Sequence, residues 1–250
     1  MLNKEILIKN ANLMVAKGKG ILAADESTPT CTKRFTSIGV DSTKEKRNEY
    51  RDLLFTTSNI EKYISGVIFY DETIRQSTIN EKIPFVTYLL EKGIIPGIKV
   101  DMGARVLSGH INEKVTEGLD GLRDRLSEYF DIGARFAKWR AVITIGDNIP
   151  TQACYEANAH ALARYASLCQ ETGIVPIVEP EVLMDGDHSI DDCFQVTLQA
   201  QKEVFKQLRT QGVMLEGIVL KPNMVISGTN CINQASTDEI ALKTVQCLKS

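Results

Sequence analysis

The chain has 250 residues, 43% hydrophobic and 24% charged, which is enough for a large globular domain with its own core. Its net charge of -3 gives no reason to expect nucleic acid or an anionic membrane as a partner, and no long apolar run predicts a membrane span. The six cysteines contain no C-x-x-C pair and the three histidines have no metal-binding spacing. We therefore expect reduced thiols, a cytoplasmic location and no metal.

Strand-like apolar runs alternate with helical patterns from one end of the chain to the other. Residues 1–20 predict an amphipathic helix. The predicted strands are 20–25, 66–71, 94–101, 134–142, 174–181 and 216–221, and the clearest helices are 43–56, 118–130, 152–171, 190–209 and 237–249. Because no hairpin signal interrupts this alternation, it predicts a parallel α/β sheet in a single domain, either a barrel or a doubly wound fold.

Charged residues at the strand ends separate the two folds. They are Asp25, Asp71, Lys99 with Asp101, Lys138 with Arg140, Glu179 with Glu181, and Lys221. An open doubly wound sheet concentrates its chemistry at one switch point, usually behind a glycine-rich loop, and no such loop follows the first strand. Contributions from many strands favour a TIM (β/α) barrel, whose active site lies at the carboxyl ends of the strands.

Lys221 ends the last apolar run and is followed by Pro222. Most lysines that follow strands are solvated surface charges, and taken alone Lys221 is interpreted as one of them. A lysine in a desolvated pocket beside other cations can instead be neutral and act as an amine nucleophile. Lys99, Lys138 and Arg140 could supply that positive field, since strand geometry directs residues two apart to the same face.

Two carboxylates could complete the chemistry. Glu179 is a candidate general acid and base for the proton transfers of iminium formation. Asp25, at the end of the first strand, could accept a proton from a substrate hydroxyl. Together with Lys221 they predict carbon–carbon cleavage through a Schiff base, without a metal or a bound cofactor.

Several long motifs occur in order along the chain. They are GKGILAADES (18–27), GIKVD (97–101), FAKWR (136–140), LARYAS (162–167), GIVPIVEPE (173–181), DGDH (185–188) and LKPNMV (220–225). On these motifs the chain resembles class I fructose-bisphosphate aldolase over essentially its whole length. The resemblance implies a glycolytic lyase that acts on sugar phosphates, needs no cofactor and is often tetrameric.

The resemblance also implies a role for each matched residue. Lys221 corresponds to the Schiff-base lysine and Glu179 to the principal proton-transfer carboxylate. Asp25 corresponds to the aspartate that acts on the C4 hydroxyl, and Lys138 to a lysine that assists beside the iminium. The implied substrate-binding residues, which line the site or hold its phosphate ends, are Lys99, Arg140, Glu181, Ser27, Lys33, Arg34 and Arg47.

Three features depart from the family pattern. Pro29 and Thr30 replace a Gly-Ser pair that animal members carry, and Met102 stands where lysine is frequent. The pattern also contains six strand–helix units where a barrel has eight. We interpret residues 1–250 as a single barrel domain that lacks the last two units and the C-terminal tail. Two alternatives stay open: a non-catalytic remnant that needs the missing part, and a Schiff-base aldolase with another sugar-phosphate preference.

Two further residues lie in the same motifs. Trp139, the only tryptophan, alternates with the charged residues of its strand and should pack outward against helices. His188 lies in the DGDH turn and is interpreted as a loop hydrogen-bonding group rather than a catalyst.

Overall fold

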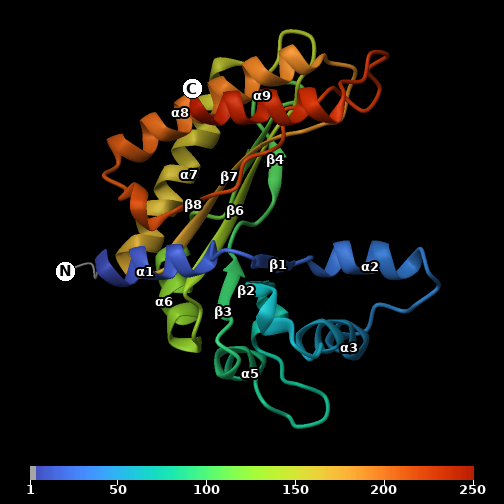
Figure 1. Cartoon of the computed structure of the whole chain (residues 1–250), viewed down its shortest axis with the longest axis vertical. Coiled ribbons are helices and arrows are strands. Elements are labelled where there is room, and N and C mark those ends of the chain that lie inside the picture. The colour runs from blue at the N-terminus through green and yellow to red at the C-terminus, as the bar shows by residue number, and fades with distance from the viewer. Residues whose placement is uncertain (1–3) are drawn as a thin grey trace.

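The computed structural model describes residues 4–250 and contains a curled parallel sheet of six strands with helices around its outer side (Figure 1). The strands lie in the order β1-β2-β3-β6-β7-β8, and each pairs in parallel with its neighbour. Their bounds are β1 Gly20–Ala24, β2 Ile64–Phe69, β3 Ile95–Lys99, β6 Phe136–Ile143, β7 Val175–Val182 and β8 Val219–Leu220. The predicted barrel-type α/β sheet is confirmed.

The helices follow the predicted pattern closely. They are α1 Lys4–Met14, α2 Thr28–Thr36, α3 Lys44–Phe55, α4 Asp71–Ile74, α5 Phe85–Glu91, α6 Leu122–Ile132, α7 Gln152–Thr172, α8 Ile190–Thr210 and α9 Thr237–Lys249. Four begin at Ser or Thr caps whose side chains accept a backbone N–H from the first turn, namely Thr43, Thr151, Ser189 and Ser236. Such caps explain why the starts of α3, α7, α8 and α9 were predictable. Helix α9 lies along α8 (Figure 1).

The outer face of the sheet packs against the helices to form the main core. Trp139 on β6 is fully buried there and stacks on Tyr165 of α7, with ring centroids 5.5 Å apart. The Tyr165 hydroxyl donates a hydrogen bond to the Ile177 carbonyl at 3.2 Å. Residues from β2, β6 and β7 enter this core, and others of the same strands enter a second apolar cluster on the inner face. Because both faces are apolar, the strands could be recognised as nearly continuous apolar runs. The predicted outward packing of Trp139 is confirmed.

The inner face carries a smaller apolar cluster below the charged strand ends. Helix α1 contributes Leu7 and Met14 to this cluster, which also contains Phe136 and Ile177. A Cβ added at Gly97 would lie 2.2 Å from the Phe136 ring, so the glycine makes room for the aromatic side chain. The two ends of the strands therefore differ: the amino ends are filled by apolar groups, and the carboxyl ends are lined by charge.

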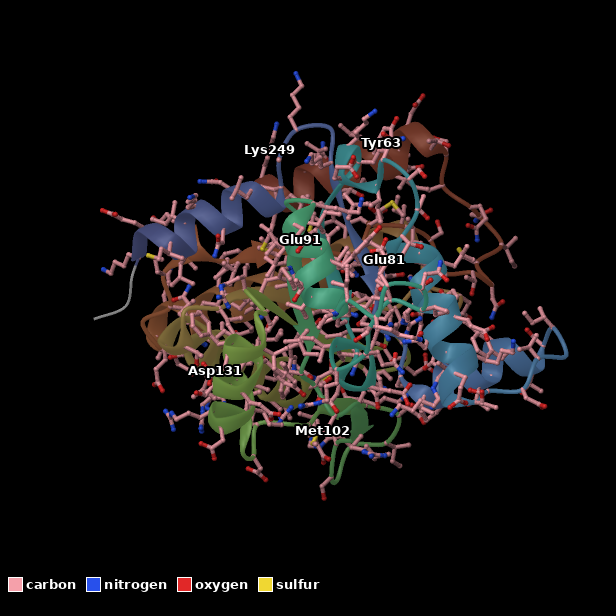
Figure 2. All side chains as sticks on the ribbon, turned by 90° about the horizontal axis from the view of Figure 1, so that it is seen from below. Tyr63, Glu81, Glu91, Met102, Asp131 and Lys249 are labelled. Carbon is pink, nitrogen blue, oxygen red and sulfur yellow. The ribbon has the colours of Figure 1, made fainter. Side chains whose placement is uncertain are left out.

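The two ends of the parallel strands are well separated in space. Tyr63, just before β2, and Met102, just after β3, lie on opposite sides of the molecule in Figure 2. This separation confines the charged groups described below to one side of the sheet.

Two local expectations were wrong. An antiparallel pair, β4 Ala104–Val106 with β5 Lys114–Thr116, lies in a region where no hairpin was expected. Its strands have three residues each and a long connection, so no two-residue turn signal marks it. The predicted strand 216–221 is shorter than expected, because Leu215–Gly217 forms a 3₁₀ turn. Within residues 4–250, no helix is long and apolar enough to cross a membrane.

Candidate active site

Parallel pairing brings the predicted catalytic residues to one edge of the inner face. Lys99 of β3 lies opposite Lys138 of β6. Arg140 of β6 lies opposite Glu179 of β7, and the Lys221 backbone N–H donates to the Val178 carbonyl at 2.9 Å. The sequence places Lys99 and Lys221 122 positions apart (221 − 99), and only the pairing of the strands brings such distant residues together.

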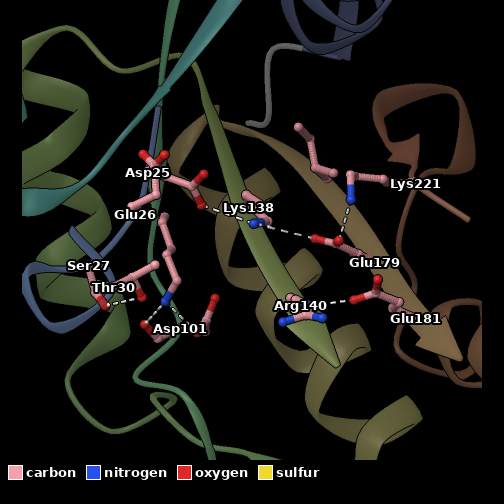
Figure 3. A network of polar contacts seen from close by, with 12 residues as sticks. Asp25, Glu26, Ser27, Thr30, Asp101, Lys138, Arg140, Glu179, Glu181 and Lys221 are labelled. Carbon is pink, nitrogen blue, oxygen red and sulfur yellow. Dashed lines mark hydrogen bonds and ion pairs between the residues drawn. The ribbon is translucent and has the colours of Figure 1, made fainter. Parts of the chain in front are cut away.

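Glu179 lies at the centre of the network and is 2% exposed. Its Oε1 accepts a short hydrogen bond from Lys221 Nζ, and its Oε2 lies 3.6 Å from Lys138 Nζ. Lys138 in turn donates to Asp25 Oδ2 at 3.0 Å. Figure 3 shows Asp25, Lys138, Glu179 and Lys221 as one continuous chain of polar contacts. Two carboxylates and two ammonium groups thus alternate along the site.

Lys138 is the residue of this polar network that stays positively charged. Burial favours its neutral amine, but the Asp25 and Glu179 carboxylates outweigh that effect and raise the pKa of Lys138 above its usual value. A side chain that is only 12% exposed therefore keeps its charge. Lys138 thus places a positive charge on the far side of Glu179 from Lys221.

Lys221 is more open to solvent than the sequence suggested. Its side chain is 51% exposed, whereas a desolvated pocket was expected. The reason is topological: β8 is an edge strand of the described sheet and pairs only with β7. The amine nevertheless points to Glu179, so its orientation agrees with a nucleophilic role even though its desolvation does not.

Two further ion pairs flank the catalytic chain. Lys99 donates to Asp101 Oδ1 at 2.6 Å, and Asp101 is only 4% exposed. Arg140 forms a close ion pair with Glu181, and both side chains are partly open to solvent. The predicted charge pairing is therefore present, mostly between residues of different strands, and between Lys99 and Asp101 at the end of β3.

The predicted phosphate-binding residues do not all gather at the site. Ser27 lies at the amino end of α2, where its hydroxyl hydrogen-bonds Thr30 at 3.0 Å. Lys33 is exposed on α2, which extends away from the sheet (Figure 1). Arg34 pairs with Glu26, and Arg47 is bound by Glu72 through two 2.7 Å contacts. Of these four residues, only Ser27 lines the cleft that Lys99 and Asp101 also line.

Sequence reasoning missed the group that holds the Asp25 loop. Arg51 is 2% exposed and pairs with Glu26 at 2.9 Å, while the Arg51 Nη2 donates to the Glu26 carbonyl at 3.0 Å. Tyr50 donates to the same carboxylate at 3.1 Å. The available signal was the spacing of Arg47 and Arg51, four residues apart on α3, which places both on one helix face.

A cleft of about 690 Å³ adjoins the network. Ser27, Lys99 and Asp101 line it, together with Arg105, which sequence reasoning did not single out. Arg105 is 67% exposed, and its contact with Glu117 is long, at 3.9 Å. Its guanidinium is therefore accessible to an anion. The cleft thus offers Lys99, three arginines and the amino end of α2 to a negatively charged ligand, and three acidic residues also line it. Among residues 4–250, no cluster of side chains is arranged to hold a metal ion.

Comparisons with known proteins show which family the chain belongs to. The family model for fructose-bisphosphate aldolase class-I, a glycolytic family, matches residues 6–250. A probable fructose-bisphosphate aldolase class 1 from Xanthomonas campestris is 59% identical over 98% of this chain and 73% of its own length. Fructose-bisphosphate aldolase 1 of Toxoplasma gondii is 51% identical over 97% of the chain and 67% of its own length.

A solved structure is equally similar. Fructose-bisphosphate aldolase from Plasmodium falciparum, crystallised with TRAP and a small-molecule inhibitor, superposes with a TM-score of 0.95 at 48% identity. The match covers 98% of this chain and 71% of that one. The likeness therefore extends over nearly the whole of this chain.

Proposed function

Because the chain belongs to the class I fructose-bisphosphate aldolase family, we propose that Lys221, Glu179, Lys138 and Asp25 carry that family's reaction here. The reaction is the reversible cleavage of fructose 1,6-bisphosphate into dihydroxyacetone phosphate and glyceraldehyde 3-phosphate. It is a lyase reaction that proceeds through a Schiff base on a lysine.

One observation carries the assignment of roles: the buried Glu179 carboxylate contacts two lysines at once. Schiff-base formation requires an amine that loses a proton and a carbinolamine that loses water. Glu179 is within reach to accept the proton from Lys221 and to return one to the departing hydroxyl. A surface lysine with no catalytic role would not need a carboxylate that is 2% exposed beside it.

The cleavage step needs a second base. In our proposal Asp25 removes the proton from the C4 hydroxyl as the C3–C4 bond breaks, and the electron pair moves into the iminium on Lys221. Lys138 stays charged because its two carboxylate neighbours raise its pKa, and it donates a hydrogen bond to Asp25 at 3.0 Å. The four residues thus divide the work into one nucleophile, two bases and one fixed cation.

Phosphate recognition is assigned to the cleft beside the network. Lys99, Ser27 and the amino end of α2 are the proposed contacts for one phosphate, and Arg105 is added to them. Arg140 and Glu181 border the other side of the site. Lys33, Arg34 and Arg47 are kept as more distant contributors, since Glu26 and Glu72 already hold the two arginines.

The non-catalytic remnant is not favoured, because Asp25, Lys138, Glu179 and Lys221 are all present and in contact with one another in sequence along the site. We extend the proposal to a single domain, to assembly as a homo-oligomer, tetrameric as in the family, and to a cytoplasmic location. The six free cysteines support the last point, as does the cytosolic aldolase 4 of Arabidopsis thaliana, 49% identical over 62% of its length.

The deciding experiment traps the Schiff base. Incubation of the chain with dihydroxyacetone phosphate and borohydride should attach one covalent adduct, which peptide mapping by mass spectrometry places on Lys221. The adduct should be lost in Lys221→Arg and kept in Lys202→Arg, a lysine on α8 outside the site. An adduct on any other lysine, or one that persists in Lys221→Arg, contradicts the assignment.

A further inference from the structure

A second cleft, of about 610 Å³, lies outside the aldolase site. It is formed by the loop that follows β6, the loop that follows β7 and the first turns of α8. None of the residues assigned to the reaction or to phosphate binding lines it. It therefore needs an explanation of its own.

The cleft is acidic. Asp147, Asp187 and Asp192 line it, and no lysine or arginine does. Asp192 is already engaged as the reciprocal cap of α8, with Ser189 Oγ at 2.7 Å. Asp147 and Asp187 are exposed and stand on different loops. The cleft thus presents negative charge from separate directions.

His188 provides an independent sign of a missing ligand. It lines the cleft and is 7% exposed, yet neither ring nitrogen has a hydrogen-bond partner among residues 4–250. His188 was expected to be a loop hydrogen-bonding group, and its backbone carbonyl accepts from Gly228, but its ring makes no such bond among these residues. Buried polar groups are normally satisfied, and an unsatisfied one at a cleft indicates that something else completes it.

The position of His188 is fixed by its backbone. Gly228 donates to the His188 carbonyl at 2.8 Å, and Asn230 donates to the Gly186 carbonyl at 2.8 Å. A Cβ at Gly228 would lie 2.4 Å from the Gly186 oxygen. The two loops are therefore packed too closely to admit a side chain at position 228. The imidazole is consequently held against the cleft without a partner of its own.

The arrangement fits an extended cation. No three ligating side chains converge among residues 4–250, and the two exposed carboxylates stand on separate loops. Between them lie Ile145, Ile149 and Val196, which are apolar. A ligand that complements both the carboxylates and the apolar residues carries ammonium groups separated by methylene segments.

We propose that this cleft binds an aliphatic polyamine. One ammonium group pairs with Asp147 and another with Asp187, and their N–H groups also supply a donor to the unprotonated nitrogen of His188. The methylene segments lie over Ile145, Ile149 and Val196. Binding of this kind is distinct from sugar-phosphate chemistry and leaves the Lys221 site free.

Spermidine is the probe for calorimetric titration of the 250-residue chain. The double variant Asp147→Asn with Asp187→Asn should weaken spermidine binding by about tenfold or more, because two ion pairs are lost. Asp185→Asn is the control for Asp187→Asn alone, since it removes one charge from the same loop but lies outside the cleft lining. The control should change the affinity less than about twofold. Borohydride trapping on Lys221 should be unchanged in all variants.

Nuclear magnetic resonance of the His188 ring gives a second readout that does not depend on a variant. Spermidine should shift the imidazole signals of His188 and leave those of the exposed His160 in place. Absence of binding at about 10 mM spermidine, an equal loss in Asp185→Asn, or an unmoved His188 overturns the proposal. Tighter binding of a lysine-rich peptide at the same residues overturns the polyamine assignment.

Discussion

At the scale of single residues, the site depends on how charges share a buried space. Glu179 is 2% exposed, and its carboxylate lies beside two lysines, Lys138 and Lys221. The carboxylates of Asp25 and Glu179 outweigh burial and raise the pKa of Lys138. The network is therefore interdependent, and removal of any one charge should alter the protonation of its neighbours.

Glu179→Gln tests the central carboxylate. It preserves shape but removes the proton acceptor of Lys221, so the rate of adduct trapping should fall by about 10²- to 10⁴-fold. The pKa of Lys138 should fall as well, because one of its two carboxylate partners is lost. Glu181→Gln, which affects only the neighbouring pair with Arg140, is the control and should have a much smaller effect. A loss below tenfold for Glu179→Gln contradicts its assigned role.

His188 should make the stability of the chain depend on pH. Burial lowers its pKa below the usual value, although Asp192 and Asp187 act in the opposite direction. The unfolded chain therefore binds this proton more readily than the folded one. The free energy of unfolding should fall as the pH drops below about 6.5, the ordinary histidine pKa, and this contribution should level off below the folded-state pKa.

The check is urea unfolding of His188→Gln between pH 7.5 and pH 5, where its slope should be shallower than that of the unaltered chain. His160→Gln, on the exposed face of α7, should retain the original slope. Identical slopes for His188→Gln and the unaltered chain would refute the argument.

At the scale of secondary structure, strand alternation explains both the core and the site. Alternate residues of β6 enter the outer core, as Trp139 does, or the inner face, as Phe136 and Lys138 do. Small residues on neighbouring strands then have to accommodate Phe136, and Gly97 does so. The inner face is consequently as tightly specified as the outer core.

Gly97→Ala should destabilise the fold. Its new Cβ would lie 2.2 Å from the Phe136 ring, which cannot move away without disturbing the inner cluster. We expect a loss of about 1–3 kcal/mol in the free energy of unfolding measured with urea. Gly20→Ala on β1 is the matched control, because nothing lies within 4 Å of its added Cβ. Restoration of stability by a second change, Phe136→Leu, would confirm the cause.

At the scale of the whole molecule, one continuous core joins the sheet to the helices from β2 to α8. Contacts of this extent make independent unfolding of parts of the structure unfavourable. The described sheet also has two edges, β1 and β8, each paired on one side only. Lys221 is exposed because its strand forms one of these edges.

Trp139 can report on that core because it is the only tryptophan and is fully buried between β6 and α7. Its fluorescence should be emitted at short wavelength and shift to longer wavelength in a single transition. That transition should coincide with the loss of helical circular dichroism in urea. Two separated transitions would show that the helices and the sheet do not unfold as one unit.

The sequence by itself determined the alternation of strands and helices, the identity of the charged strand ends and the family resemblance. Those features are local: apolar period, caps at Thr43, Thr151, Ser189 and Ser236, and contiguous motifs. The sequence also indicated Lys221 and Glu179 as partners, although 41 residues separate them.

Only the tertiary structure decided which charges meet. Pairing of β6 with β7 placed Lys138 beside Glu179, and the curl of the sheet brought it to Asp25 after β1, whereas Arg47 pairs with Glu72. Edge position left Lys221 half exposed, and loop packing buried His188 without a partner. These outcomes depend on residues distant in sequence competing for the same partners, and a local pattern does not contain that competition.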